Sequence, residues 1–217
     1  MLEKYKTIIN TKQIEIIEKK SRFIASISPI KIEDDAKIFI EKIKKNHWNA
    51  THNVFAYQLG YRNEIQRFSD DGEPSGTAGK PILDILINED IKNIVIVVTR
   101  YFGGILLGTG GLVRAYSKAA KECIYKAGIS EMILYKKFSI KTDYNSSGKI
   151  QYEILKNNHI IYDTLYSENV EYIVLTEIKY SEQFYKKIFD ISNGKANINI
   201  IKELYATFSN DKIILYE

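Results

Sequence analysis

The chain has 217 residues, of which 45% are hydrophobic, and it carries a formal net charge of +4. This length predicts one large domain or two small ones with packed cores. No apolar run approaches the ~18 residues of a membrane span, and the single cysteine, Cys123, excludes an internal disulfide and a cysteine-cluster metal site.

The N-terminus and the distribution of charge add two expectations. Residues 1–5 lack the apolar core of a signal peptide, so we expect a cytoplasmic protein without a membrane partner. Residues 1–134 hold 20 basic and 16 acidic side chains, whereas residues 135–217 hold 11 of each. All five arginines lie in the first part, and arginine offers planar, bidentate donors that suit phosphate and carboxylate. A basic face can equally serve solubility alone.

The residues up to 59 are predicted to form four strands and one helix. Residues 5–9 and 13–17 predict an opening hairpin, and residues 21–27 predict a third strand. An amphipathic helix is expected from Asp34 or Asp35 to Asn46. The alternating strand at residues 51–59 has His52 near its start, where a hydrogen-bonded structural role is favoured over a metal-ligand role.

An acidic segment at residues 69–81 is the first unusual stretch. It reads Ser69-Asp70-Asp71-Gly72-Glu73-Pro74-Ser75-Gly76-Thr77-Ala78-Gly79-Lys80-Pro81. The carboxylates could bind a hard cation or pair with Arg100 and Arg114, and the cation is the weaker choice because the spacing fails the calcium-loop pattern. Lys80 is followed by Pro81, so there is no Gly-Lys-Ser/Thr phosphate loop. Pro81 fits the first turn of a helix through residues 82–86.

A glycine-rich segment at residues 94–116 is the second unusual stretch. It reads Ile94-Val95-Ile96-Val97-Val98-Thr99-Arg100-Tyr101-Phe102-Gly103-Gly104-Ile105-Leu106-Leu107-Gly108-Thr109-Gly110-Gly111-Leu112-Val113-Arg114-Ala115-Tyr116. Its start predicts a buried, central strand, and its glycine loop leads into a helix that Gly128 ends. Arg114, expected in the first helical turn, opposes the helix dipole there unless an anion is also present. The other interpretation is a tight turn that needs glycine only for its backbone geometry.

From residue 136 the predicted order of elements is βαββαβ, the split ferredoxin-like arrangement. Strands are expected at residues 138–142, 159–167, 170–180 and 197–208, and helices at residues 146–157 and 182–191. Aromatic side chains on such a sheet can bind RNA, although packing is the favoured role of Tyr162, Tyr166, Tyr172 and Tyr180. We therefore predict an α+β chain with domains at residues 1–134 and 135–217.

Several motifs resemble the IMPACT/YigZ family. They are Lys20-Ser21-Arg22-Phe23, Ala50-Thr51-His52-Asn53, the acidic segment 69–79, and the stretches 98–104 and 107–116. The resemblance covers the whole chain in its bacterial arrangement. It implies that the first domain has the fold of the second domain of small-subunit ribosomal protein five. It also implies that the second domain looks like domains III and V of elongation factor G. Translation regulation is the function usually attached to the family.

The favoured function is a non-catalytic cytoplasmic protein that binds RNA, the ribosome or a translation factor. No cofactor, metal or sequence-specific DNA motif is expected. The expected phosphate-contacting or base-contacting residues are Arg22, Arg67, Arg100, Tyr101, Gly103, Gly104, Gly108, Gly110, Gly111 and Arg114. The supporting or ligand-binding loop residues are His52, Asp70, Asp71, Gly72, Glu73, Ser75, Gly76, Thr77 and Gly79. Tyr101, Phe102 or Tyr116 would stack on a base or simply pack.

Two other interpretations stay open. One is an enzyme for a small phosphorylated or acidic substrate, with Asp70, Asp71 or Glu73 as base or Mg²⁺ ligand, although no nucleophile–base pair can be named. In the other, both motifs serve structure only, and Asp70 and Asp71 neutralise Arg100 and Arg114 in a buried network.

Overall fold

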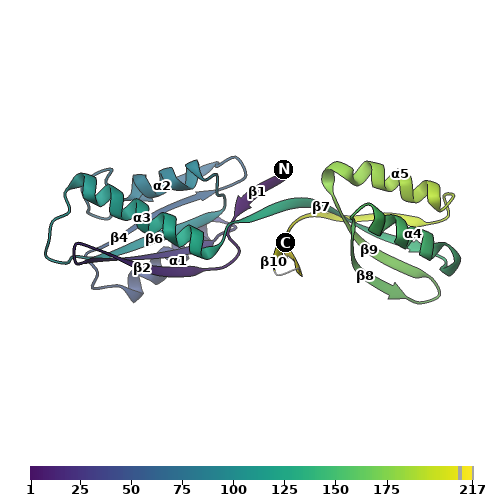
Figure 1. The fold of residues 1–217 in the computed structure, drawn as a ribbon, viewed down its shortest axis with the longest axis horizontal. Coiled ribbons are helices and arrows are strands. Elements are labelled where there is room, and N and C mark those ends of the chain that lie inside the picture. Colours follow the sequence, from purple (N-terminus) through teal and green to yellow (C-terminus); the bar gives the residue numbers. More distant parts are fainter. Residues whose placement is uncertain (210–211, 217) are drawn as a thin grey trace. The chain divides into compact units, whose positions relative to one another are not determined.

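The structure is a computed structural model that describes residues 1–209 and 212–216. The chain forms two compact units, which are mixed α+β as the sequence predicts (Figure 1). One unit holds Met1 with Tyr5–Glu131, and the other holds Leu2–Lys4 with Met132–Glu217. The division falls between residues 131 and 132, whereas the sequence placed it between residues 134 and 135.

A five-stranded antiparallel sheet, in the order β2-β3-β6-β4-β5, forms the first unit. Its strands are β2 (Lys12–Glu18), β3 (Ser21–Pro29), β4 (His52–Leu59), β5 (Ile65–Ser69) and β6 (Ile94–Tyr101). β6 is the central strand, as its β-branched sequence predicted, and every side chain from residue 94 to residue 100 is buried. A strand that is apolar on both faces needs a covering layer on each side of the sheet.

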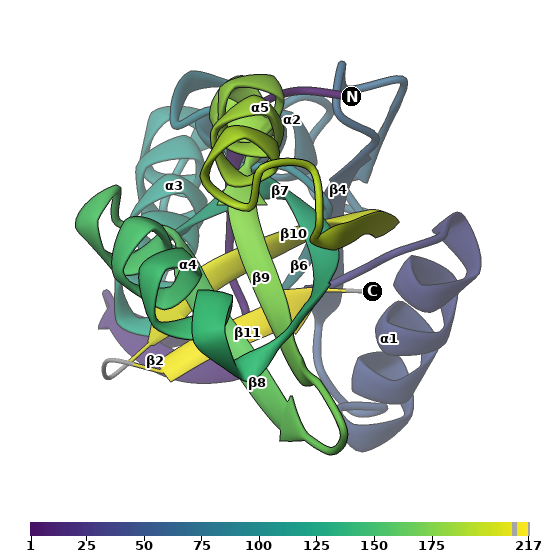
Figure 2. The ribbon, with the colours of Figure 1, turned by 90° about the vertical axis from the view of Figure 1, so that its right-hand side faces the viewer.

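Helices supply these two layers. α2 (Gly79–Asn88) and α3 (Thr109–Ala127) pack on the face of β6 that carries Ile96, and α1 (Glu33–Asn46) packs on the face that carries Val97. Figure 2 shows α1 on the opposite side of the sheet from α2 and α3. Pro81 stands in the first turn of α2 and Gly128 ends α3, as expected. Arg114 lies in the second turn rather than the first, because α3 begins at Thr109.

The second unit is a ferredoxin-like domain, as predicted. Its elements are β7 (Ser130–Thr142), α4 (Tyr144–Lys156), β8 (Ile160–Tyr166), β9 (Val170–Glu177), a 3₁₀ turn (Ile178–Tyr180), α5 (Ser181–Ile191), β10 (Asn197–Ser209) and β11 (Lys212–Tyr216). The strand order is β11-β10-β7-β9-β8. Phe138, Tyr172 and Phe184 lie in the core beneath the helices, so packing is the role of Tyr172. None of the described helices is long and apolar enough to cross a membrane.

Strand pairing is where the sequence prediction was wrong. β1 (Lys4–Thr7) pairs with β7 instead of forming a hairpin with β2, and β2 pairs with β3 through a turn at Lys19 and Lys20. Apolar alternation identifies a strand and its buried face, but it does not identify the partner.

The sequence analysis also missed the edge strands β5 and β11. All residues of β5 are exposed or half-buried, so its sequence carries little alternation.

Cys123 gives a direct test of the packing of α3 on the sheet. Its thiol is buried 3.3 Å from the carbonyl oxygen of Ala25, and burial raises its pKa to about 12. Because the thiolate is the reactive form, a chromogenic thiol reagent at about pH 8 is expected to leave the native protein unmodified. Unfolding in guanidinium should release one reactive thiol per chain. Rapid reaction of the native protein would contradict this packing.

Candidate functional site

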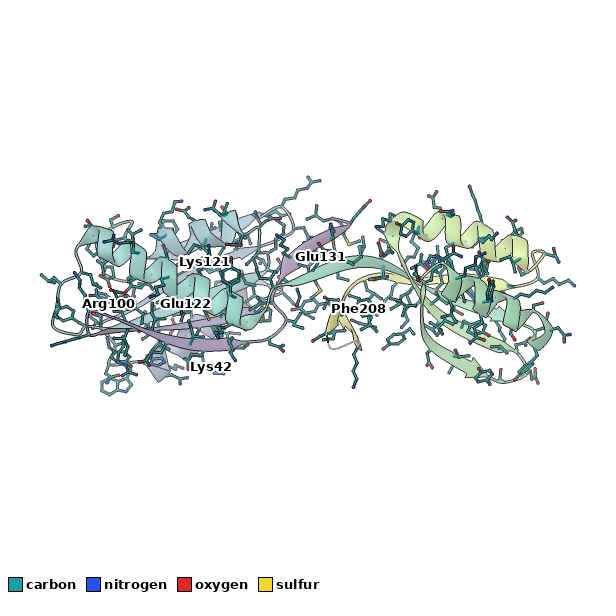
Figure 3. The ribbon with its side chains drawn as sticks, in the orientation of Figure 1. Lys42, Arg100, Lys121, Glu122, Glu131 and Phe208 are labelled. Carbon is teal, nitrogen blue, oxygen red and sulfur yellow. The ribbon has the colours of Figure 1, made fainter. Side chains whose placement is uncertain are left out.

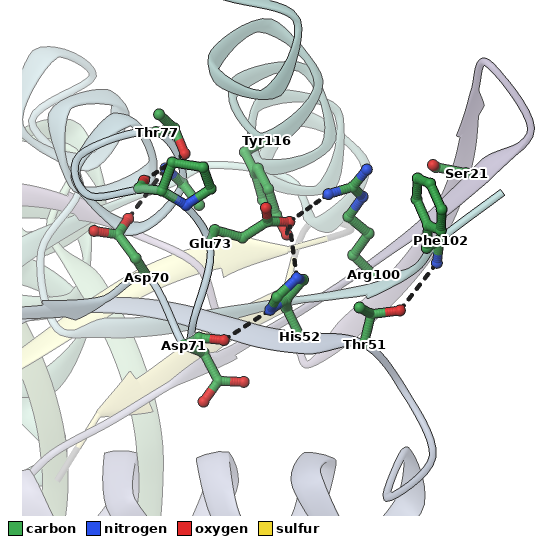
Figure 4. Close-up of polar contacts among 12 residues, drawn as sticks. Ser21, Thr51, His52, Asp70, Asp71, Glu73, Thr77, Arg100, Phe102 and Tyr116 are labelled. Carbon is green, nitrogen blue, oxygen red and sulfur yellow. Dashed lines mark hydrogen bonds and ion pairs between the residues drawn. The ribbon is translucent and has the colours of Figure 1, made fainter. Parts of the chain in front are cut away.

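The acidic and glycine-rich segments meet at one end of the first sheet. Glu73 from the acidic loop, His52 from β4, Arg100 from β6 and Tyr116 from α3 point toward one another (Figure 4). One carboxylate oxygen of Glu73, Oε1, accepts hydrogen bonds from Arg100 Nη1 and from the Tyr116 hydroxyl, each at 2.7 Å. His52 Nε2 lies 3.7 Å from the same oxygen. We call these four residues the Glu73 cluster.

The Glu73 cluster is a buried, neutralised charge pair. The side chains of Arg100 and Glu73 are only 6% and 3% exposed. The Arg100 guanidinium carbon also lies 5.5 Å from the ring centre of Phe23 and 5.6 Å from that of Phe102, within cation–π range. Burial and the hydrogen bond to Glu73 raise the pKa of Tyr116, so its hydroxyl stays protonated and donates. Removing one member of such a pair would leave the other as a buried charge without its partner.

Asp70 shapes the acidic loop by binding the loop's own backbone. Its carboxylate accepts hydrogen bonds from the N–H groups of Gly76 at 2.8 Å, Ala78 at 3.1 Å and Gly79 at 2.8 Å. The last two groups begin α2, so Asp70 satisfies donors that the helix leaves free at its N-terminus.

Asp71 joins the loop to β4 and directs Glu73 inward. Its Oδ2 accepts from Asn53 N at 2.6 Å, and its carbonyl oxygen lies 2.8 Å from His52 Nδ1. Asp71 and Gly72 have positive φ angles of 45° and 88°, which turn the chain sharply before Glu73. Asp70, Asp71 and Glu73 therefore all hold protein groups. Within the described residues, no three His, Cys, Asp or Glu side chains are placed to hold a metal ion.

The buried network of the structural interpretation exists, but with other residues. Glu73, not Asp70 or Asp71, neutralises Arg100. Arg114 is exposed, and no ion pair is found for it in the described part of the chain. The sequence suggested that both arginines are accessible to a ligand. Arg100 is instead buried, whereas Arg114 is exposed.

The β2–β3 turn packs directly against the glycine loop, residues 103–111. Gly103 N donates to Ser21 Oγ at 3.2 Å, and a Cβ atom on Gly103 would collide with the backbone of Lys20. Only glycine permits this approach. Next to it, Arg22 stands opposite Tyr101 in the register of β3 and β6, with its guanidinium carbon 5.4 Å from the Tyr101 ring centre. Figure 3 shows Arg100 at this end of the first unit, with Lys121 and Glu122 farther along α3.

The start of α3 offers unused backbone donors beside this loop. Its N-cap residue Gly108 provides no side-chain cap, and the first turn contains no acidic residue. The space above Gly110 is open. Unpaired N–H groups and the helix dipole both favour an anion at such a helix end.

Arg67 does not join this group. In the register of the sheet it stands opposite Tyr57, which in turn pairs with Val95 near the start of β6. Arg100 is five residues farther along β6, which is roughly 17 Å at the rise of a β-strand. The structure thus brings Arg22, Tyr101, Arg114 and the glycine loop to one end of the sheet and places Arg67 toward the other.

Trp48 is a surface residue at this end of the first unit that the sequence pattern did not identify. Trp48 lies between α1 and β4 and is 82% exposed. The available signal was a lone aromatic residue between the polar residues Asn46, His47 and Asn49. In such a turn no apolar period reports whether the ring is buried.

A cavity of about 780 Å³ lies within the second unit. His159, Glu153 and Phe184 are among its lining residues, and burial lowers the pKa of His159. It contains no residue of either motif, so the candidate site remains in the first unit.

Comparison with known proteins assigns the chain to a family. Residues 19–124, which include the whole Glu73 cluster, match the Impact N-terminal domain. The IMPACT family member YvyE of Bacillus subtilis (strain 168) is 44% identical over 198 residues, which cover 91% of each chain. This chain belongs to the IMPACT family. Residues 140–195 match a domain of unknown function, DUF1949.

Other IMPACT relatives span both units. The IMPACT family member YigZ of Escherichia coli (strain K12) is 32% identical over 200 residues, which cover 90% of this chain and 98% of that protein. A crystal structure of a hypothetical protein is 29% identical, with a TM-score of 0.60. It covers 93% of this chain and 99% of that chain. The similarity in sequence to YigZ and in fold to the hypothetical protein therefore extends over both units.

Proposed function

We propose that this IMPACT family protein is a non-catalytic RNA-binding regulator of translation. Its first unit would contact phosphates through Arg22, Arg114 and the backbone of the glycine loop. The observation that carries the proposal is the uncapped, acid-free start of α3, whose second turn presents the exposed Arg114. The translation role rests on what is usually attached to the family.

The bonding of the acidic loop favours binding over catalysis. A general base or Mg²⁺ ligand needs a carboxylate that can reach a substrate or ion. Asp70 is occupied by backbone N–H groups, and Glu73 is occupied by Arg100 and Tyr116. The Arg22–Glu15 pair is different, because both side chains stay solvent-accessible and a phosphate can replace Glu15.

The test is the salt dependence of RNA binding. Fluorescence anisotropy with a labelled single-stranded RNA of about 12 nucleotides should give an affinity that falls steeply between about 50 and 200 mM salt. Because each phosphate contact on a single strand contributes roughly 0.7 to the log–log salt slope, the Arg22→Gln/Arg114→Gln variant should lose about 1.4 from that slope.

The matched control changes two arginines away from the loop. Arg62 and Arg67 lie in or just before β5, so Arg62→Gln/Arg67→Gln removes the same charge without touching the proposed contacts. Affinity and slope should stay near those of the wild type. A flat salt response, or equal losses in the two double variants, would count against specific phosphate binding at the glycine loop.

A further inference from the structure

Large apolar side chains are exposed at the end of the first unit that carries the glycine loop. Trp48 and Leu106 are each 82% exposed, Phe102 is 46% exposed and Ile105 is 41% exposed. Single exposed apolar residues are ordinary, but several large ones at one end of a domain indicate an interaction surface. The proposed phosphate contacts leave these four side chains without a role.

Hydrogen bonds hold the two segments that carry these residues side by side. Thr51 N donates to the Arg100 carbonyl oxygen at 2.9 Å. Phe102 N donates to Thr51 Oγ1 at 3.1 Å (Figure 4). The Tyr101 hydroxyl lies 3.0 Å from His47 Nδ1 and donates to Asn49 Oδ1 at 3.3 Å. Hydrogen bonds thus join the turn around Trp48 to the end of β6 and to Phe102, which follows it.

The charge around this surface selects the partner. Three segments contribute to it, and none of them contains an aspartate or glutamate: residues 19–32, 42–63 and 91–121. Two acidic side chains of neighbouring segments pair with their basic residues, Glu15 with Arg22 and Asp71 with Lys44. Lys19, Lys20 and Arg22 lie in the first of these segments, at the turn and strand that pack against Gly103. Glu73, the carboxylate within the cluster, is buried and neutralised by Arg100. An apolar surface with a basic surround complements an anionic polymer that also presents flat apolar faces.

We propose that Trp48 and Phe102 stack on the bases of single-stranded RNA, while Lys20 and Arg22 bind its backbone. This inference rests on the proposed function and names the form of RNA and the residues that read it. Proteins bind single-stranded nucleic acids through aromatic rings beside a positively charged groove. Every base can stack on such a ring, so this contact depends little on the nucleotide sequence. A duplex keeps its base faces stacked inside the helix, so it would use the basic residues alone.

Trp48 is the only tryptophan of the chain, so the tryptophan emission of the protein comes from this residue alone. A labelled oligouridine of about 12 nucleotides would be titrated with the full-length protein while oligonucleotide anisotropy and tryptophan emission are both recorded. Emission should be quenched in parallel with the rise in anisotropy. A blunt duplex of the same length should bind with little quenching.

Substitution separates stacking from charge. Trp48→Ala should weaken single-strand binding by about 5- to 150-fold, the range for loss of one base–aromatic stack. Trp48→Phe keeps a ring and should retain most of the affinity. Ile38→Ala is the control for lost exposed apolar area, because Ile38 is 68% exposed on α1 and lies ten residues before Trp48. It should bind like the wild type.

The outcomes distinguish this inference from the proposed function. Salt-dependent binding with unquenched Trp48 emission and no loss in Trp48→Ala would overturn stacking and leave phosphate binding in place. A duplex that competes as well as the single strand would overturn stacking in the same way. Absence of binding to any RNA would overturn the proposed function itself, and this inference with it. In that case a protein partner would be the occupant of the surface.

Discussion

Replacing Glu73 with alanine is expected to lower the free energy of unfolding of the first unit by about 3–5 kcal/mol, the usual cost of breaking a buried ion pair from one side. The substitution would leave the Arg100 guanidinium, whose side chain is 6% exposed, without its counter-charge. It would also remove the acceptor of the Tyr116 hydroxyl. The four residues of the cluster come from β4, the acidic loop, β6 and α3. Loss of Glu73 should therefore weaken the contacts among these four segments.

Hydrogen exchange read by mass spectrometry can locate this effect. Peptides from β6 and α3 should lose protection in Glu73→Ala, while peptides from β9 in the second unit serve as an internal reference. Asp84→Ala is the matched control, because Asp84 pairs with Lys80 on the surface of α2 and is 47% exposed. Such a surface change should cost less than about 1 kcal/mol. Equal losses in the two variants would mean that the buried pair contributes little.

A double variant tests the cause of the expected loss. Glu73→Ala/Arg100→Met removes both charges and leaves an apolar side chain in place of the stranded guanidinium. Replacing a whole buried pair by apolar groups is often close to neutral. The double variant should therefore be more stable than Glu73→Ala alone. If it is less stable, the penalty comes from lost packing rather than from the unpaired charge.

Gly103→Ala is expected to destabilise the same end of the domain by about 1–3 kcal/mol, the range for forcing extra atoms into a packed site. The added methyl group would meet the backbone carbonyl of Lys20 and the amide nitrogen of Ser21. These are main-chain atoms, so the loop and the β2–β3 turn would have to separate. Calorimetry should then show a melting temperature lower by roughly 3–12 °C.

Gly110→Ala is the natural counterpart of this variant. Gly110 lies in the first turn of α3, and nothing stands within 4 Å of the place where its Cβ would be. Alanine there should raise stability by roughly 0.4–1 kcal/mol, because it restricts the unfolded chain without a clash. Two glycines of one loop should thus respond with opposite signs. A destabilised Gly110→Ala would indicate that the start of α3 is more crowded than the structure describes.

Long periodic segments were predictable because their signal is local. α1 and α3 carry an apolar stripe at helical spacing, and the β-branched residues from Ile94 to Val98 require burial on both faces. These features determined the helices and the central place of β6. The ferredoxin-like order of the second unit followed in the same way. β5 and β11 were not recoverable, because short edge strands are half-solvated and carry weak alternation.

The sequence alone determined the long periodic elements and the two-domain α+β class, and it offered a pairing of the acidic segment with Arg100 and Arg114 as one possibility. Tertiary structure alone decided which carboxylate faces Arg100, since three acidic residues lie close together in the chain. The positive φ angles at Asp71 and Gly72 send Glu73 inward and leave Asp70 to the backbone. The tertiary structure also decided that Arg100 is buried while Arg114 and Trp48 face solvent. Burial depends on contacts between residues distant in sequence, and no local pattern encodes them.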